Sequence, residues 1–182
     1  MFKKNLLLIG LLFIFVKANA QQTFTLKSND LGGSFTKKNE FKGFGCDGEN
    51  ASPQLSWANA PEGTKSFAIT CYDPDAPTGA GWWHWVVFDL PQNTTEIISK
   101  AGNPLLNLLP KGAIQSSTSF GGTGFGGPCP PKGHGIHTYI FTVYALKTDK
   151  LGLDATANPE LVGYYLWQNT IAKATIVAYY QR

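Results

Sequence analysis

The alternation of hydrophobic and polar positions predicts a chain built mostly from β-strands. The clearest segments are residues 23–27, 66–72, 83–90 and 138–146, which are rich in β-branched and aromatic side chains. Turn-forming residues separate them, as at residues 61–64. We therefore expect a mainly β, mostly antiparallel fold.

Shorter or less regular segments lie between these strands. Residues 52–57 should be extended, because Pro53 disfavours helix in the residue before it. Residues 96–99 are short and apolar, and residues 103–111 fit either a short helix or an irregular apolar loop. Residues 30–48 mix glycine, lysine and aromatic side chains, which predicts a combination of strand and loop.

The C-terminal part of the chain changes character. Asn158 suits a helix N-cap, Pro159 the first turn, and Glu160 the positive end of the helix dipole. We expect this helix to run to about Ala172. A last strand should follow at residues 174–180, which are β-branched and aromatic.

The N-terminal end has the pattern of a secretory signal peptide. Lys3 and Lys4 precede an apolar stretch at residues 6–16, which is too short to span a bilayer comfortably. Residues 18–20 then form a small-x-small cleavage site. This order of a basic start, an apolar centre and small residues is typical of a leader that is removed on export.

Cleavage after Ala20 would remove residues 1–20 and leave one domain at residues 21–182. We therefore expect a periplasmic or secreted protein. The alternative is that the leader stays attached as a membrane anchor. No later segment is apolar enough to cross a membrane, so we expect no membrane span in the domain.

Loss of the leader would also change the net charge. The full chain has 15 basic and 12 acidic side chains, a formal net charge of +3. Lys3, Lys4 and Lys17 lie in the part that would be removed, which contains no acidic residue. The remaining domain is near neutral and has no basic stripe, which argues against nucleic acid as a partner.

Three cysteines follow the predicted cleavage site. Cys46 and Cys129 lie in glycine-rich loops, whereas Cys71 ends an apolar strand. In an oxidising compartment an odd number allows at most one bridge and a free thiol. We expect a Cys46–Cys129 disulfide. The alternative is three free thiols, with Cys71 acting as a small buried hydrophobic residue.

The densest group of chemically active side chains lies at residues 73–88. Asp73 and Asp75 flank a proline, and His84 stands among tryptophans after a glycine turn. His137 starts a predicted strand after a long glycine- and proline-rich segment, and such loops often carry function. If these groups converge, the histidines and backbone N–H groups could bind an anion such as phosphate, with the aspartates orienting the histidines.

Each of these residues also has a purely structural interpretation. The aspartates could form a turn by bonding their own backbone, and His84 could be packed in the core. The sequence contains no HExxH or paired CxxC for a metal, no G-x-S-x-G elbow and no P-loop. We expect no cofactor, no metal and no catalytic residue. Hydrolysis by Asp and His groups is the enzyme alternative.

Three stretches together point to a family. Residues 73–91 (DPDAPTGAGWWHWVVFDLP), residues 126–146 (GGPCPPKGHGIHTYIFTVYAL) and residues 46–57 (CDGENASPQLSW) resemble the phosphatidylethanolamine-binding protein (PEBP) family. The likeness is closest to its bacterial branch of Raf kinase inhibitor-like proteins. It extends from about Gln22 to the C-terminus.

The resemblance implies an antiparallel β-sandwich around a large central sheet, with a C-terminal helix. It also implies a small cavity that binds anions and phosphorylated headgroups. By position, its walls would be Asp73, Asp75, His84, Pro131, His137 and Tyr139, with Trp57 and Trp83 lining or supporting it. We therefore expect a non-enzymatic binder of a phosphate-like anion or a phosphorylated headgroup. The alternative is a secreted inhibitor of kinases or proteases that acts on a protein partner; the oligomeric state, including a homodimer, stays open.

One departure from the family pattern concerns charge. The family usually has G-x-H-R-Y, and here Thr138 replaces the arginine. Residues 117–120 are STSF where bacterial members often have an RNDF-like segment. An acid and an arginine are both missing, so we hypothesise that an ion pair was lost as a unit. This hypothesis requires Ser119 to lie close to Thr138.

Overall fold

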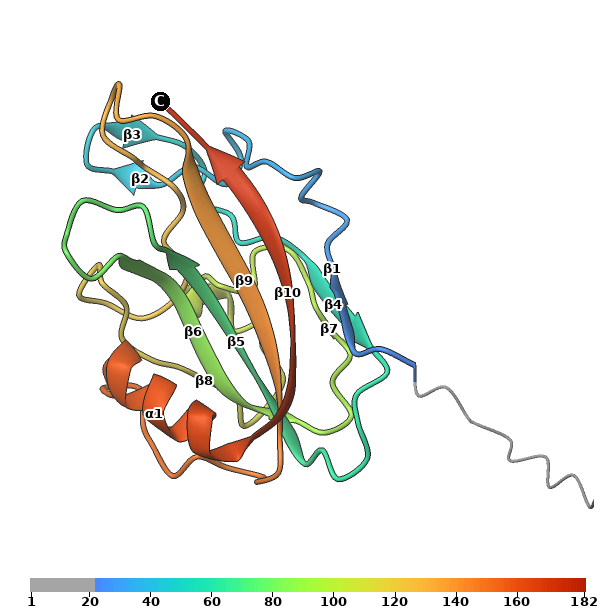
Figure 1. Ribbon diagram of the computed structural model, residues 1–182. Coiled ribbons are helices and arrows are strands. Elements are labelled where there is room, and N and C mark those ends of the chain that lie inside the picture. The colour runs from blue at the N-terminus through green and yellow to red at the C-terminus, as the bar shows by residue number, and fades with distance from the viewer. Residues whose placement is uncertain (1–21) are drawn as a thin grey trace, which may run out of the picture.

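A computed structural model describes residues 22–182, and the predicted signal peptide lies outside this part of the chain. The centre of the fold is a five-stranded antiparallel sheet (Figure 1). Its strands, in spatial order, are β10 (Thr170–Tyr180), β9 (His137–Leu146), β5 (Ser66–Asp73), β6 (Trp82–Pro91) and β8 (Ile114–Gln115). The prediction of a mainly β, antiparallel fold with a large central sheet is confirmed.

A smaller sheet and the C-terminal helix cover opposite sides of the central sheet (Figure 1). The smaller sheet contains β1 (Thr25–Lys27), β4 (Leu55–Ala58) and β7 (Glu96–Ile97), and the helix is α1 (Pro159–Asn169). One apolar cluster joins Leu55 of β4 to Ile69 of β5. The other joins Val162 of α1 to Phe88 of β6. Successive side chains along the central strands therefore point alternately into two separate apolar cores, because side chains alternate between the two faces of a strand.

The helix begins as predicted and ends early. The Asn158 side chain accepts a hydrogen bond from the backbone N–H of Leu161 at 2.8 Å, which is an N-cap contact. The helix stops at Asn169 rather than near Ala172. Thr170 already has an extended backbone and starts β10, because β-branched residues favour a strand over a helix.

A β-bulge in β6 decides which of its side chains share a face. Cys71 of β5 pairs with Trp85, but the next residue, Tyr72, pairs with Trp83. His84 is therefore an extra residue between two pairs. The bulge breaks strict alternation: Trp83 turns to the helix side, where its ring packs on Tyr72 with centroids 4.5 Å apart. Strict alternation would instead place Trp83 and Trp85 on the same face.

The remaining short elements lie in the loops. For residues 103–111 the sequence allowed either a short helix or an irregular loop. The segment contains a 3₁₀ turn, η1 (Pro104–Leu106), and is otherwise irregular. A two-stranded hairpin of β2 (Lys42–Gly43) and β3 (Cys46–Asp47) stands at the end of the central sheet where β9 begins (Figure 1). It is this end of the sheet that holds the candidate site.

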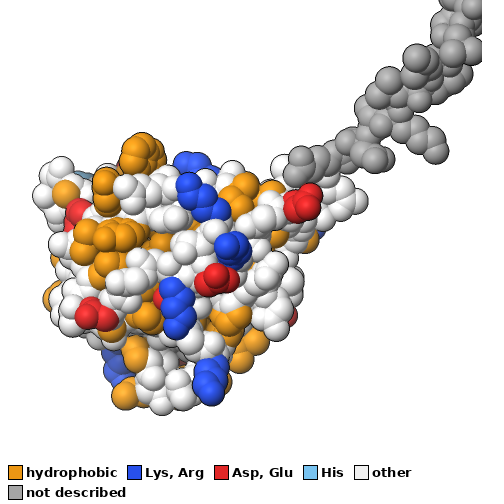
Figure 2. Space-filling model, turned by 90° about the horizontal axis from the view of Figure 1, so that it is seen from below, with side chains coloured by type: hydrophobic (Ala, Val, Ile, Leu, Met, Phe, Trp, Pro, Cys, Tyr) orange, Lys and Arg blue, Asp and Glu red, His pale blue; other side chains and the backbone are white. Residues whose placement is uncertain are grey.

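The described surface mixes charges of both signs. Figure 2 shows that, on the face seen from below, basic and acidic side chains lie among one another and among hydrophobic groups. None of the helices within residues 22–182 is long and apolar enough to cross a membrane.

Candidate functional site

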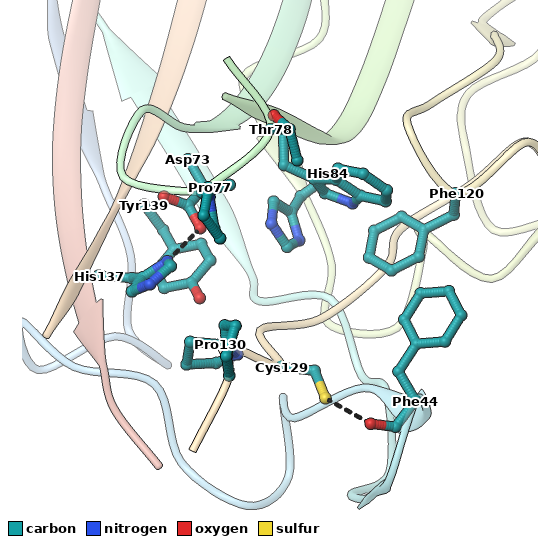
Figure 3. A pocket seen from close by; sticks show the side chains of 13 residues that line it. Phe44, Asp73, Pro77, Thr78, His84, Phe120, Cys129, Pro130, His137 and Tyr139 are labelled. Atoms are coloured by element: carbon teal, nitrogen blue, oxygen red, sulfur yellow. Dashed lines mark hydrogen bonds and ion pairs between the residues drawn. The ribbon is translucent and has the colours of Figure 1, made fainter. Parts of the chain in front are cut away.

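A cavity of about 210 Å³ opens where β5 ends and where β6 and β9 begin (Figure 3). Most of its wall is aromatic or proline side chains. Its polar side chains are Asp73, Thr78, His84, His137 and Tyr139, and Trp82 adds an indole N–H group. The strand ends and the glycine- and proline-rich loop therefore meet at one site, and Asp73, His84 and His137 line one cavity as the family resemblance implied.

Asp73 and His137 form a buried hydrogen-bonded pair in the cavity wall. The Nδ1 atom of His137 lies 2.7 Å from Oδ2 of Asp73, and the two side chains are 2% and 4% exposed. The Nε2 atom of His137 lies 2.8 Å from Nδ1 of His134, which is exposed. Both ring nitrogens of His137 are thus engaged within the protein. A chain of three side chains links the buried carboxylate to the surface.

Asp75 supports the site from outside the cavity. Its backbone N–H donates to Oδ1 of Asp73 at 2.8 Å, which is the predicted aspartate turn. Its side chain accepts a hydrogen bond from the backbone N–H of Thr138 at 2.7 Å. Asp75 therefore ties the end of β5 to the start of β9 and does not line the cavity.

His84 is buried, and one of its nitrogens is committed to the protein. Its Nδ1 atom lies 2.6 Å from the carbonyl oxygen of Gly126, so Nδ1 carries the hydrogen and donates it. Burial lowers the pKa of His84 to about 4, although the hydrogen bond to Gly126 and the charge of Asp73 act in the opposite direction. At neutral pH the ring is uncharged, and its Nε2 atom is a hydrogen-bond acceptor.

Tyr139 lies beside His84 on the floor of the cavity. The two rings meet edge to face with centroids 5.0 Å apart. Burial and the nearby charge of Asp73 raise the pKa of Tyr139 well above its ordinary range. Its hydroxyl group therefore stays protonated and can donate a hydrogen bond.

Aromatic side chains form a rim along one side of the cavity mouth. Phe120 packs edge to face on Trp82 and on His84, with centroids 5.4 Å and 5.3 Å apart. Phe44, at the tip of the β2–β3 hairpin, stacks on Phe120 and is 71% exposed. Figure 3 shows Phe44 and Phe120 on one side of the cavity and the Asp73–His137 pair on the other.

The hairpin that carries Phe44 has a tight turn. Phe44 and Gly45 have positive φ angles of 51° and 78°, the pattern of a type I′ turn. A phenylalanine is unusual at positive φ, and such strain persists only where the surroundings impose it. The C-terminal Arg182 is one such constraint, because it donates to the carbonyl oxygens of Gly45 at 2.7 Å and Pro130 at 3.0 Å.

A disulfide between Cys46 and Cys129 joins the hairpin to the cavity wall. Cys129 lines the cavity and Cys46 begins β3. The third cysteine, Cys71, is free and buried, and burial raises the pKa of its thiol. The bridge therefore fixes one side of the cavity mouth.

Glu40 ties this hairpin region to β10. Its buried carboxylate accepts hydrogen bonds from Lys37 at 2.7 Å, from the backbone N–H of Asp47 at 3.0 Å and from the Tyr180 hydroxyl. Burial alone would raise the pKa of Glu40, but these hydrogen bonds outweigh it and lower the pKa from 4.5 to about 2. Ionised Glu40 therefore stabilises the folded state.

The pH dependence of this contribution follows from the sign of the shift. Because the folded state lowers the pKa of Glu40, the stabilisation is complete above pH 4.5 and is lost as the pH falls toward 2. We expect Glu40→Gln to be less stable than wild type at pH 7, with the difference closing across that window. Urea unfolding at several pH values measures this. Glu49→Gln, at an exposed glutamate of the same loop, is the matched control; a Glu40→Gln deficit that stays constant down to pH 2 would contradict the argument.

The structure does not bring every expected residue to the cavity. Pro131 lines it, together with Asp73, His84, His137 and Tyr139. Trp57 and Trp83, which we expected to line or support it, do not. Trp57 packs on Phe67 in the core between the two sheets, with centroids 5.3 Å apart. Trp83 is turned to the helix side by the bulge at His84, and its neighbour Trp82 lines the cavity instead.

The hypothesis of a lost ion pair is wrong. Ser119 exchanges backbone and side-chain hydrogen bonds with Trp83 on the outer side of β6, whereas Thr138 lies in β9. Strands β6 and β5 separate the two positions. At about 4.8 Å between neighbouring strands, they are not in contact.

Sequence reasoning missed several residues of the site. They are His134, which extends the buried pair to the surface, and the rim residues Phe44, Trp82, Phe120, Pro77 and Pro130. Only for His134 did the sequence contain a feature that could have predicted its place in the site. It is one of three histidines and lies three residues before His137. Within residues 22–182, no group of three or more His, Cys, Asp or Glu side chains is arranged to hold a metal ion.

Comparisons with known proteins agree with this architecture. The chain matches the family model described as phosphatidylethanolamine-binding protein over residues 32–181. It is 47% identical over 178 residues to the UPF0098 protein YbcL of Escherichia coli (strain K12), a match that covers 96% of this chain and 97% of that protein. The UPF0098 protein YbhB of the same organism is 47% identical over 155 residues, 84% of this chain and 97% of that protein.

A solved structure gives the same result. The crystal structure of E. coli YbcL, described as a new member of the mammalian PEBP family, has a TM-score of 0.85 and 50% sequence identity to this chain. The match covers 87% of this chain and 98% of that one.

Proposed function

Since the chain belongs to the phosphatidylethanolamine-binding protein family, whose fold binds ligands, we propose that its cavity binds a phosphate-like anion or a phosphorylated headgroup. The observation that carries this proposal is the meeting of His84 and Tyr139 in a cavity of about 210 Å³. Both side chains are buried and both direct polar atoms into it. The volume suits a small headgroup and not a whole lipid molecule.

The chemistry of the wall favours binding over catalysis. Catalysis by a nucleophile needs that group beside a free base. Cys129 is in the disulfide, and the Thr78 hydroxyl donates to the carbonyl oxygen of Gly81. Both nitrogens of His137 are engaged by its neighbours. We therefore propose a non-enzymatic binding protein.

We also propose that the protein works outside the cytoplasm. A disulfide that bridges a cavity wall suits an oxidising compartment, and it agrees with the leader-like pattern at residues 1–20. N-terminal sequencing of the protein from the periplasm or the medium of expressing cells would test this. A chain that still starts at Met1 and stays in the cytoplasm would contradict it.

The binding proposal is tested by calorimetric titration with phosphorylethanolamine. We expect saturable binding to the wild-type protein and at least about tenfold weaker binding to His84→Ala, because one hydrogen-bond partner is lost. Trp167→Ala is the control, since this residue is on the exposed side of α1 and does not line the cavity. Equal binding to wild type and His84→Ala would refute the proposed site.

A further inference from the structure

Two polar atoms on buried side chains of the cavity wall are left without a partner by the protein. His84 donates from Nδ1 to Gly126, and among residues 22–182 nothing hydrogen-bonds to its Nε2 atom. The Tyr139 hydroxyl is likewise without a partner among the described residues, and Tyr139 is only 1% exposed. Both residues line the cavity, so a ligand bound there can reach these two atoms.

These two atoms have opposite hydrogen-bonding characters. The Nε2 atom of neutral His84 can only accept, and the Tyr139 hydroxyl can donate. The other polar side chains of the wall are already bonded within the protein, except the indole N–H of Trp82, which is partly exposed at the rim. Each oxygen of Asp73 accepts a hydrogen bond, and both nitrogens of His137 are engaged. Among the buried side chains of the wall, the groups still unpaired therefore call for one donor and one acceptor on the ligand.

The cavity wall also lacks a side chain with a permanent positive charge. Within the part of the chain that the structure describes, no lysine or arginine lines it, and Asp73 is the one carboxylate that does. A fully ionised dianion would face the lone pair of His84 and this carboxylate without a counter-ion. Such burial of unpaired charge is strongly unfavourable.

We propose that the cavity selects an oxyanion that carries a proton, such as a singly protonated phosphate monoester, and that the ligand donates this proton to Nε2 of His84. This inference rests on the proposed function and specifies its ligand. The Tyr139 hydroxyl donates to an unprotonated oxygen of the same group. No covalent bond changes, and the proton remains shared between the ligand oxygen and Nε2.

The neighbours of His84 explain why the ligand must bring the proton. The titratable groups that face the ring are Asp73 of β5 and His137 and Tyr139 of β9; the loop from residues 120 to 126 adds Phe120 and a carbonyl oxygen. Burial outweighs the charge of Asp73 and lowers the pKa of His84 to about 4. At pH 6 only about 1% of the rings are protonated before binding.

Sulfate gives a sharp test, because it has the shape of phosphate but carries no proton near neutral pH. Sulfate could bind only to the protonated ring, so at pH 6 we expect phosphate to bind about 100-fold more tightly. Phosphorylethanolamine, with a second pKa of about 6, should lose about tenfold in affinity between pH 7 and pH 8. Calorimetric titrations of the full domain with phosphate, phosphorylethanolamine, sulfate and free ethanolamine measure these differences.

A substitution at His84 should weaken the preference for phosphate over sulfate. His84→Gln places an amide near the position of Nε2, and its NH₂ group can donate to sulfate, so we expect the preference for phosphate to fall below about tenfold. His84→Asn keeps a donor near Gly126 but nothing at the position of Nε2, so both anions should bind weakly. Thermal unfolding of the two variants checks that they fold.

The outcomes separate this inference from the proposed function. A strong preference for phosphate in the wild type that is lost in His84→Gln supports both. Equal affinity for phosphate and sulfate overturns the protonated-ligand inference and leaves the proposed function standing. Tight binding of free ethanolamine also overturns it, because the donor would then be the amine. Failure of every phosphate ligand to bind overturns the proposed function itself.

Discussion

Replacing Asp73 by alanine should lower the free energy of unfolding by about 3 to 5 kcal/mol, the range for removing one partner of a buried pair. The carboxylate accepts one hydrogen bond from His137 and another from the backbone N–H of Asp75. Both Asp73 and His137 are almost fully buried, so water replaces the lost partner less well than it would at an exposed position. Urea unfolding measures the effect. A domain of ordinary stability would lose a large part of its free energy of unfolding.

Asp75→Ala is the matched control for this prediction. It removes a carboxylate two residues away in the same turn, but from an exposed position where water can take over its bond to Thr138. We expect a loss below about 1 kcal/mol. Adding His137→Phe to Asp73→Ala should recover part of the loss, because no buried polar group is then left unpaired. Equal losses for Asp73→Ala and Asp75→Ala would show that the buried pair contributes little.

The sequence predicted the strands of the central sheet well because their signal is local. Residues 66–72 and 138–146 are continuous apolar and β-branched runs, and they appear as β5 (Ser66–Asp73) and β9 (His137–Leu146) with nearly the expected bounds. The meeting of Asp73 and His137 was implied by the family resemblance, because the local pattern does not show that β5 and β9 are neighbours. The end of one strand and the start of another were predicted to carry polar groups, and antiparallel pairing placed them side by side.

The faces of β6 could not be predicted in the same way. Nothing in the local sequence distinguishes a bulge at His84 from regular alternation, because a bulge is defined by the pairing with β5. The extra residue changed which face of the sheet Trp82 and Trp83 occupy. Trp82 lines the cavity, and Trp83 packs on the other side of the sheet. This shift also explains why His84 can serve the cavity while Trp85 belongs to the core.

The rim of the cavity could not be predicted from the sequence for a different reason. Phe44 lies in a hairpin of very short strands, and its position over the cavity depends on contacts distant in sequence. Arg182 holds the turn from the opposite end of the chain, and Cys129 holds β3 across 83 residues. Local patterns do not carry such information. The third histidine, His134, was missed although its spacing from His137 could have suggested it.

Reducing the Cys46–Cys129 disulfide should destabilise the fold by about 4 to 5 kcal/mol in the chain-entropy description of a cross-link. The bridge closes a loop with a sequence separation of 83, and a long loop loses much conformational freedom when it is closed in the unfolded state. For a domain of this size the midpoint of urea unfolding should fall by about 2 M. The measurement is unfolding with and without dithiothreitol at one pH.

The double variant Cys46→Ala/Cys129→Ala is the control, because it should resemble the reduced wild type and should not respond to dithiothreitol. Cys71 is retained in both proteins, so any effect through this buried thiol would appear in both. The bridge also holds one side of the cavity mouth, since Cys129 lines the cavity and Cys46 follows the turn that carries Phe44. Reduction should therefore weaken binding of phosphorylethanolamine under conditions where the domain is still folded. An unchanged urea midpoint on reduction would show that the folded contacts around the hairpin, and not the cross-link, hold this end of the sheet together.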